Sequence, residues 1–359
     1  MKARVVVLAV LLLAPTCGGG SDSTAAPTTT LTPATTTTAP TTTLTPATTA
    51  TNAPTQLGSL SAPDDPTIHL INLSSTPTSE LRSWANLASN KMADQNANIL
   101  VVLYHIGRNL GPEDPDRFGG HPFTPNEVLL SQAQIDGLMA QIEEWLQNDL
   151  CMGHQDEEER LDEELYRYRL WLEEGADTST QVGLCEKTRF VMMAWKEGSP
   201  VWDTQRFLVH ELYHAFQHDL EGDCNDTIDR KGRGDHTPVV VEGGADYFTY
   251  FVAHELYTDA DRREFEFGSP LSTLLKEAKE RTYEDGSDEV MGSGMATRAA
   301  AVLALMVENG WLDHESLLDG SFFHDCARSD LNESNSHYIY AKNNWSRIVE
   351  NSGEWKFSN

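Results

Sequence analysis

Two segments of the chain place ionisable side chains four residues apart inside otherwise apolar stretches. The first holds His210 and His214, and the second holds Glu242 and Asp246. Residues four apart share one face of an α-helix, so each segment predicts a helix that presents two ionisable groups on the same side. Because burying such groups is costly unless they pair or bind a metal, we expect the two helices to face a shared polar centre.

The first segment carries the sequence His-Glu-Leu-Tyr-His at residues 210–214. On a helix both imidazoles can reach one ion, and Glu211 between them can act on water activated by that ion without being a ligand. Apolar residues fill much of the surrounding stretch, which predicts a helix over residues 203–220. This segment is therefore the candidate metal-binding helix, with Glu211 as the candidate catalytic base.

Two histidines leave a catalytic zinc site one short of its usual three protein ligands. Glu242 is the candidate third ligand, and Asp246 is expected to accept a hydrogen bond from a liganding imidazole and fix its tautomer. Gly243 and Gly244 each cost roughly 1 kcal/mol in a helix relative to alanine. We attribute them to a close approach of this helix to the metal-binding helix, where a Cβ would clash. The chain is thus expected to bind one catalytic Zn²⁺ ion.

Together, His210-Glu211-x-x-His214 and Glu242-Gly-x-Ala-Asp246 resemble the gluzincin branch of zinc metallopeptidases, which has thermolysin-like architecture. The resemblance covers about residues 185–310. It implies an enzyme that hydrolyses peptide bonds in peptides or proteins. The metzincin pattern would require a further histidine at position 220, where this chain has leucine.

The same resemblance implies two further features. A strand near the metal-binding helix pairs with extended substrate in such enzymes, and residues 190–195 are the candidate. A later helix often supplies a side chain that stabilises the transition state; residues 283–305 loosely resemble it, and Tyr283 is the candidate there. His236, in a polar loop that could reach over the site, is a second candidate. The rival interpretation is a catalytically inactive surface lipoprotein that keeps the zincin fold for binding. The presence of Glu211 favours the enzyme.

The first 17 residues predict a secretory signal. A short basic start is followed by an unbroken apolar run over residues 5–14, which is too short to span a bilayer. Cys17 and the Gly/Ser stretch after it resemble a bacterial lipoprotein processing site, so a lipid on Cys17 is expected; ordinary cleavage and release is the alternative. Either way the protein is expected outside the cytoplasm, anchored at the cell surface or secreted.

Residues 18–62 are rich in threonine, proline and alanine. So few large apolar groups cannot offset the entropy lost on ordering, so we interpret this segment as a disordered linker. The folded domain is then confined to residues 63–359.

Cysteine content and charge fit an exported domain. An even number of cysteines beyond Cys17 predicts two disulfides with three connectivities open. We favour Cys151–Cys185 together with Cys224–Cys326. The net charge of −29 disfavours nucleic acid and anionic membrane surfaces as partners. Contact with a membrane is therefore expected only through the N-terminal anchor.

Hydrophobic periodicity places strands early and helices late in the folded part. Strands are predicted over residues 98–105 and 188–195, and helices over residues 125–150, 157–173, 203–220, 239–256, 260–265, 270–281, 294–309 and 336–350. This order indicates an α+β fold with a small N-terminal sheet followed by a mostly helical C-terminal part. With the metal motif, it predicts a zincin-like catalytic domain.

Overall fold

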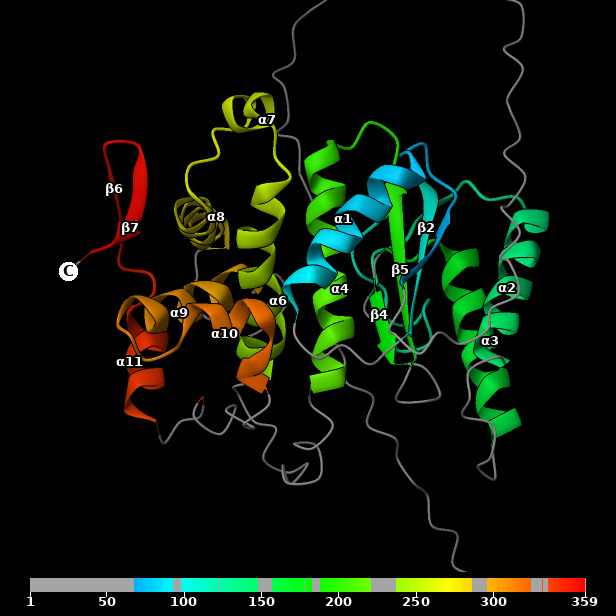
Figure 1. The fold of residues 1–359 in the computed structure, drawn as a ribbon. Coiled ribbons are helices and arrows are strands. Elements are labelled where there is room, and N and C mark those ends of the chain that lie inside the picture. The colour runs from blue at the N-terminus through cyan, green and yellow to red at the C-terminus, as the bar shows by residue number, and fades with distance from the viewer. Residues whose placement is uncertain are drawn as a thin grey trace, which may run out of the picture.

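The computed structural model describes residues 68–92, 98–121, 123–147, 157–177, 179–182, 188–220, 237–285, 296–323, 331 and 335–358. These residues form a mixed α+β structure in which helices cover both faces of a small sheet (Figure 1). The predicted α+β class is therefore confirmed. No helix in these described ranges is both long and apolar enough to cross a membrane.

The sheet has the strand order β1-β2-β5-β4, with β3 beside the end of β2. Its strands are β1 (Ile68–Asn72), β2 (Asn98–Asn109), β3 (Asn126–Val128), β4 (Ser179–Val182) and β5 (Thr188–Lys196). β1 and β5 run parallel to β2, whereas β3 and β4 are antiparallel to their neighbours. Residues 99–104 of β2 are all buried, which explains their continuous apolar run.

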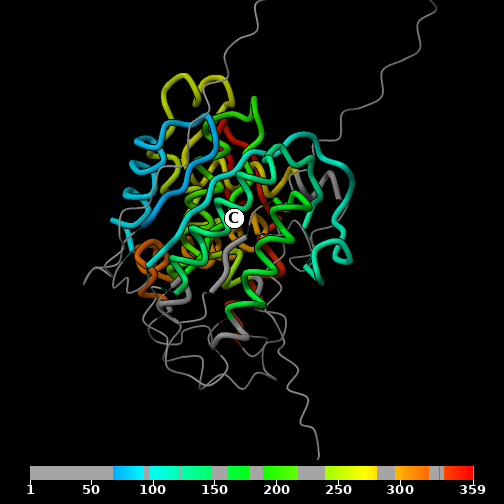
Figure 2. Tube along the Cα trace, turned by 90° about the vertical axis from the view of Figure 1, so that its right-hand side faces the viewer, coloured from blue at the N-terminus to red at the C-terminus, as the bar shows by residue number. Residues whose placement is uncertain are grey.

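One face of the sheet is covered by α2 (Gln132–Gln147) and α3 (Glu157–Glu174). Trp171 and Tyr168 of α3 and Phe190 of β5 are fully buried in the core on this side. Figure 2 views the molecule from this face, with the C-terminal helices behind the sheet.

The other face is covered by α1 (Thr78–Lys91) and α4 (Val201–Leu220). A layer of helices then packs beyond α4: α6 (Thr237–Val252), α8 (Pro270–Asp285), α9 (Ala296–Glu308) and α10 (His314–Asp319). The periphery consists of the 3₁₀ turns η2 (Ala253–Glu255) and η3 (Ser321–Phe323), α7 (Asp259–Glu264), α11 (Ser336–Asn344) and the hairpin of β6 (Ile348–Asn351) and β7 (Glu354–Phe357). α6 therefore lies between α4 and α9, where its buried carboxylates can face α4 (Figure 1).

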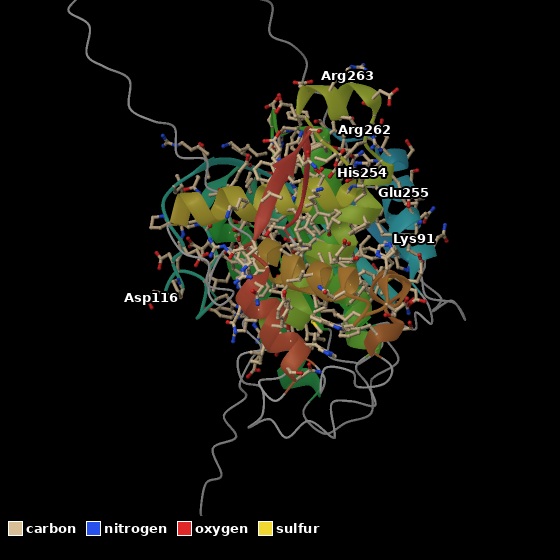
Figure 3. The ribbon with its side chains drawn as sticks, turned by 90° about the vertical axis from the view of Figure 1, so that its left-hand side faces the viewer. Lys91, Asp116, His254, Glu255, Arg262 and Arg263 are labelled. Atoms are coloured by element: carbon tan, nitrogen blue, oxygen red, sulfur yellow. The ribbon has the colours of Figure 1, made fainter. Side chains whose placement is uncertain are left out.

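Polar contacts join α1 to the segment after α6. Lys91 at the end of α1 forms an ion pair of 2.7 Å with Glu255 of η2 (Figure 3). Arg262 of α7 donates to the backbone oxygen of His254 at 2.6 Å. The ion pair links α1 to η2, and the second contact ties α7 to η2.

Two of the predicted helices differ from the observed ones by more than five residues at one end. The helix predicted over residues 125–150 begins only at Gln132, because residues 126–128 form β3. Ser131 and Gln134 exchange hydrogen bonds with each other's backbone N–H groups, an arrangement that starts a helix. The helix predicted over residues 336–350 ends at Asn344, and a hairpin follows. Both early strands, over residues 98–105 and 188–195, are confirmed as parts of β2 and β5.

Two helices, α1 and α10, were not predicted. The predicted signal peptide (1–17), Cys17, the linker (18–62) and the first residues of the domain precede the described part of the chain. The four cysteines of the domain, Cys151, Cys185, Cys224 and Cys326, also lie outside it. The disulfide pairing and the lipid anchor therefore stay predictions.

Candidate metal centre

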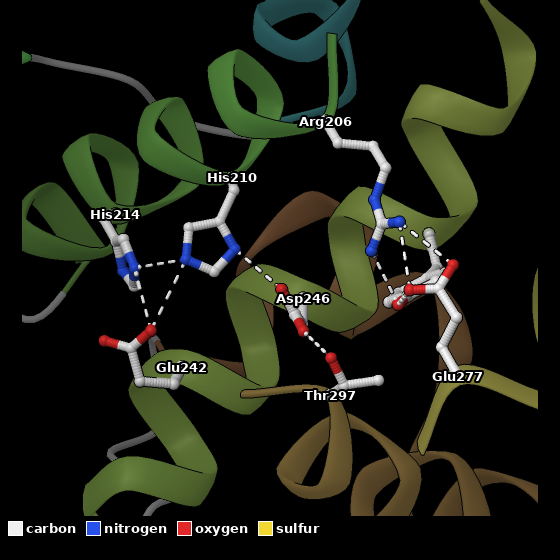
Figure 4. Close-up of polar contacts among 8 residues, drawn as sticks. Arg206, His210, His214, Glu242, Asp246, Glu277 and Thr297 are labelled. Carbon is white, nitrogen blue, oxygen red and sulfur yellow. Dashed lines mark hydrogen bonds and ion pairs between the residues drawn. The ribbon is translucent and has the colours of Figure 1, made fainter. Parts of the chain in front are cut away.

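Three buried donor atoms converge between α4 and α6. The Nε2 atoms of His210 and His214 are 3.0 Å apart, and each lies 3.5 Å from Oε2 of Glu242 (Figure 4). Donor atoms that surround a small divalent ion as a tetrahedron, at bonds of about 2.0–2.1 Å, lie about 3.3 Å apart. The three separations fall around that value. These three residues form a buried group that could hold a metal ion.

The chemistry of the donor set fits a cation. Glu242 is only 3% exposed, and its Oε1 is buried without a hydrogen-bond partner among the described residues. A buried carboxylate oxygen in that position is costly unless a positive charge offsets it. Two imidazole nitrogens and one carboxylate oxygen are also ligand types that catalytic divalent metal sites use.

Asp246 orients one of the two imidazoles. Nδ1 of His210 lies 2.9 Å from Oδ1 of Asp246, and Oγ1 of Thr297 donates to Oδ2 of the same carboxylate at 2.8 Å (Figure 4). Because an ionised carboxylate can only accept, His210 carries a proton on Nδ1, and its Nε2, which faces Glu242 and His214, is the nitrogen left to bind a metal ion. The tautomer of His210 is thus set for metal binding, through the contact expected of Asp246.

The electrostatics of the centre favour a cation as well. Burial raises the pKa of Glu242, but His214 and His210 bring it down to about 2. Burial also raises the pKa of Asp246, yet its hydrogen bond with His210 and the charge of Arg206 bring it below the ordinary value. For His210, burial lowers the pKa, whereas the hydrogen bonds to Asp246 and Glu242 raise it well above 6.5 overall. Two carboxylates therefore carry negative charge inside a buried centre.

Gly243 serves a different neighbour from the one expected. A Cβ at this position would lie 2.8 Å from the carbonyl carbon of Ala299 and 2.9 Å from its Cβ. Ala299 belongs to α9, so the close approach that excludes a side chain is between α6 and α9. The prediction that Gly243 makes room for α4 was wrong, because the two sides of α6 pack against different helices. One side carries the polar groups toward α4, and the other packs backbone to backbone on α9.

The remaining predicted site residues fall into two groups. Glu211 lies on α4 between the two histidines in sequence and is buried. Tyr283 belongs to α8, but its side chain lies outside the described residues, as does all of His236. Neither candidate transition-state donor is therefore placed relative to the three donor atoms.

The strand predicted to pair with substrate is an internal strand. β5 is bonded to β2 on one side and to β4 on the other, with Phe190 opposite Leu100 and Gln181. Residues 190–192 thus pair with strands on both sides, and the N–H of Ala194 donates to the backbone oxygen of Asp177, so the candidate strand is not an open edge of the sheet. The outer edge on this side of the sheet belongs to β4, which contacts α4.

Several polar residues beside the centre were not predicted. Thr297 is one of them. The others form a network around Arg206, which lies one turn before His210 on α4. Nη1 of Arg206 donates to both carboxylate oxygens of Glu277, at 3.0 and 3.1 Å, and Nη2 donates to the hydroxyl of Tyr250 at 2.7 Å (Figure 4). Sequence spacing could have placed two of them on the same helix faces as the metal centre, since Arg206 precedes His210 by four residues and Tyr250 follows Asp246 by four.

Comparisons of the chain with protein-family models, with curated proteins and with solved structures found no match.

Proposed function

We propose that this protein is a zinc-dependent peptidase of the gluzincin type, with a zincin-like catalytic domain. The observation that carries the proposal is the set of three donor atoms at near-tetrahedral separations, built from two helices, with Glu211 between the two histidines. His210, His214 and Glu242 would hold the ion, which is the ligand composition of one class of catalytic zinc sites.

The proposed chemistry is the addition of water to a peptide bond. An ion held by His210, His214 and Glu242 would supply Lewis acidity toward the scissile carbonyl and lower the pKa of water. The carboxylate of Glu211 accepts a proton from the attacking water and delivers it to the leaving amine nitrogen as the carbon–nitrogen bond breaks. Asp246 keeps the proton of His210 on Nδ1 throughout, so that Nε2 stays a ligand. His236 and Tyr283 remain the candidates for stabilising the transition state.

An extended peptide is the substrate class that the sheet edge favours. β4 is paired antiparallel to β5 on one side, and no strand of the described residues pairs with its other edge. A peptide that adds a strand to such an edge bonds through its main chain, which is largely independent of sequence. Because β4 contacts α4, a peptide bound there would run alongside the helix that carries His210 and His214.

The proposed setting of the enzyme is outside the cytoplasm. This rests on the signal-like first 17 residues and on the linker of residues 18–62. The enzyme would be held at the cell surface by a lipid on Cys17, or released after ordinary cleavage. Its partners would be peptide or protein substrates, and any membrane contact would be through the N-terminal lipid.

Turnover of a quenched fluorescent peptide library tests the proposal. We expect activity that a chelator abolishes and added Zn²⁺ restores. Glu211→Gln should lose nearly all turnover while keeping its zinc, because only the proton acceptor is gone. Glu255→Gln is the matched control, since Glu255 is half-exposed and pairs with Lys91 on the surface; it should keep wild-type activity. Zinc-loaded protein without turnover of any peptide would instead favour the inactive binding lipoprotein.

A further inference from the structure

The polar groups between α4 and α6 form a ladder with one rung per helical turn. On each helix they are spaced by four residues and so share one face. The rungs, from one end to the other, are His214 with Glu242, His210 with Asp246, and Arg206 with Tyr250. From one rung to the next, the residue number decreases by four on α4 and increases by four on α6. The two helices are therefore antiparallel, and each turn of α4 faces one turn of α6. The first two rungs belong to the metal centre, and the third does not touch it.

The third rung is tied to a third helix. Glu277 of α8 accepts two hydrogen bonds from Arg206 and one, of 2.5 Å, from the hydroxyl of Tyr250. The guanidinium also lies 4.5 Å from the centre of the Tyr250 ring and 5.7 Å from the Trp202 ring. Arg206 is therefore held on several sides at once by side chains of α4, α6 and α8.

We propose that Arg206, with Tyr250 and Glu277, is a positioning residue for the metal centre that sets the register of α4 on α6. The proposal rests on the metal-binding part of the proposed function and does not depend on peptide cleavage. Arg206 acts at a distance of one helical turn, because His210 follows it on the same face of α4.

The geometry gives a physical reason for this role. A metal site is productive only when its ligands are held within about 0.5 Å of the required positions. The planar guanidinium of Arg206 binds Glu277 through Nη1 and Tyr250 through Nη2, so it restricts both distance and direction, unlike a single point charge. Sliding or rotating α4 against α6 would break these bonds together with the cation–π contact. The third rung thus resists the motions that would pull His210 and His214 away from Glu242.

The energetic cost of burying the ion pair between Arg206 and Glu277 also supports a positioning role. Arg206 and Glu277 are both largely buried, with side chains about one-fifth exposed, and a buried ion pair often adds no more stability than apolar side chains of similar volume. An ion pair of similar exposure, Arg167 with Glu164, lies within α3 and so links no two helices, whereas Arg206 and Glu277 belong to α4 and α8. The position of this ion pair, one turn beyond the two metal-binding rungs, is better explained by its effect on the register between α4 and α6 than by a contribution to stability.

The first test is the double variant Arg206→Gln/Glu277→Gln, which replaces both charged groups with neutral amides and leaves no unpaired charge. Zinc affinity is measured by competition with a chromophoric chelator, and the visible spectrum of the Co²⁺-loaded protein reports the ligand geometry. We expect zinc affinity to fall by about 10- to 100-fold, as for other groups that orient metal ligands, with an altered Co²⁺ spectrum. Wild-type affinity and spectrum in a folded variant would overturn the proposal.

A pair of single variants keeps the test decisive if the double variant does not fold. Tyr250→Phe and Tyr247→Phe each remove a hydroxyl from α6, but that of Tyr247 contacts His314 of α10 at 2.7 Å. We expect weaker zinc binding in Tyr250→Phe and wild-type binding in Tyr247→Phe. Equal affinities in the two variants would overturn the role of the third rung alone. A wild-type chain that binds no zinc would overturn the proposed function together with it.

Discussion

Two helix pairs on opposite sides of the sheet, α2 with α3 and α4 with α6, bury different kinds of side chain. The buried residues described in α2 and α3 are all hydrophobic, with Ile142, Trp171 and Leu172 fully enclosed. In contrast, α4 and α6 bury two histidines and three acidic residues, namely His210, His214, Glu211, Glu242 and Asp246. Helices of similar length and amphipathic pattern therefore pack through apolar side chains between α2 and α3, and through ionisable side chains between α4 and α6.

The difference distinguishes the apolar packing that stabilises the fold from the buried polar groups that form a binding site. Apolar burial stabilises a helix pair without further partners, at roughly 25 cal/mol per Å² removed from water. Buried carboxylates and imidazoles carry a desolvation cost that only pairing or a metal offsets. We infer that the α2–α3 side is stable regardless of metal, and that the α4–α6 side gains stability when metal binds the folded state. The predictions below test this contrast, in order of their expected effect on metal affinity.

The largest effect is expected for Glu242→Ala. The change leaves two protein ligands where a catalytic zinc site uses three, so the ion should be lost at ordinary buffer concentrations. Elemental analysis after dialysis measures this directly. Full zinc occupancy in the variant would remove Glu242 from the ligand set.

An intermediate effect is expected for Asp246→Ala. The variant keeps all three ligands but loses the acceptor that holds the proton of His210 on Nδ1. Zinc should stay bound with an affinity about 10- to 100-fold lower, as measured by chelator competition. Zinc retained by Glu242→Ala but lost from Asp246→Ala would mean that the two carboxylates have exchanged roles.

A smaller effect is expected for Thr297→Val, which removes the hydrogen bond to Oδ2 of Asp246 without changing side-chain shape. The loss of one such bond corresponds to a roughly 2- to 10-fold decrease in zinc affinity. Thr249→Val is the matched control, because Thr249 of α6 is buried like Thr297 of α9 but its hydroxyl has no partner among the described residues. Equal affinities in the two variants would exclude Thr297 from the centre.

No change in zinc affinity is expected for Ile142→Ala on the apolar side. The cavity should lower the free energy of unfolding by about 2–5 kcal/mol, as measured by denaturant unfolding of the metal-free protein. Chelator competition on the folded variant should give the wild-type affinity, since Ile142 of α2 lies in a core separated from α4 by the sheet. A variant that binds zinc much more weakly would show that the two sides are coupled.

Much of this contrast was predictable from local sequence patterns. The spacing of four between His210 and His214, and between Glu242 and Asp246, suffices to place each pair on one helix face. Continuous apolar runs gave β2 and β5. Local signals were also present where the bounds were wrong: Ser131 and Gln134 mark the start of α2, and Leu81, Trp84, Ala85 and Ala88 have the spacing of the missed helix α1.

Other features depend on contacts between distant segments. Nothing near Gly243 in the sequence indicates that Ala299 is the neighbour that excludes its side chain. The contacts of Thr297 with Asp246 and of Glu277 with Arg206 likewise arise from α9 and α8 packing on α6. The internal position of β5 follows from strand order, which the apolar run of a single strand does not reveal. Tertiary packing, not propensity, therefore fixes the surroundings of the metal ligands.

The metal content of purified protein tests the central claim most directly. After export and dialysis against metal-free buffer, elemental analysis of the wild type should find about one zinc ion per chain, and His214→Ala should contain none. Circular dichroism of both proteins would establish that the variant keeps its helices. Zinc-free wild-type protein that takes up no added Zn²⁺, or a folded His214→Ala variant with full zinc content, would contradict the assignment of this centre.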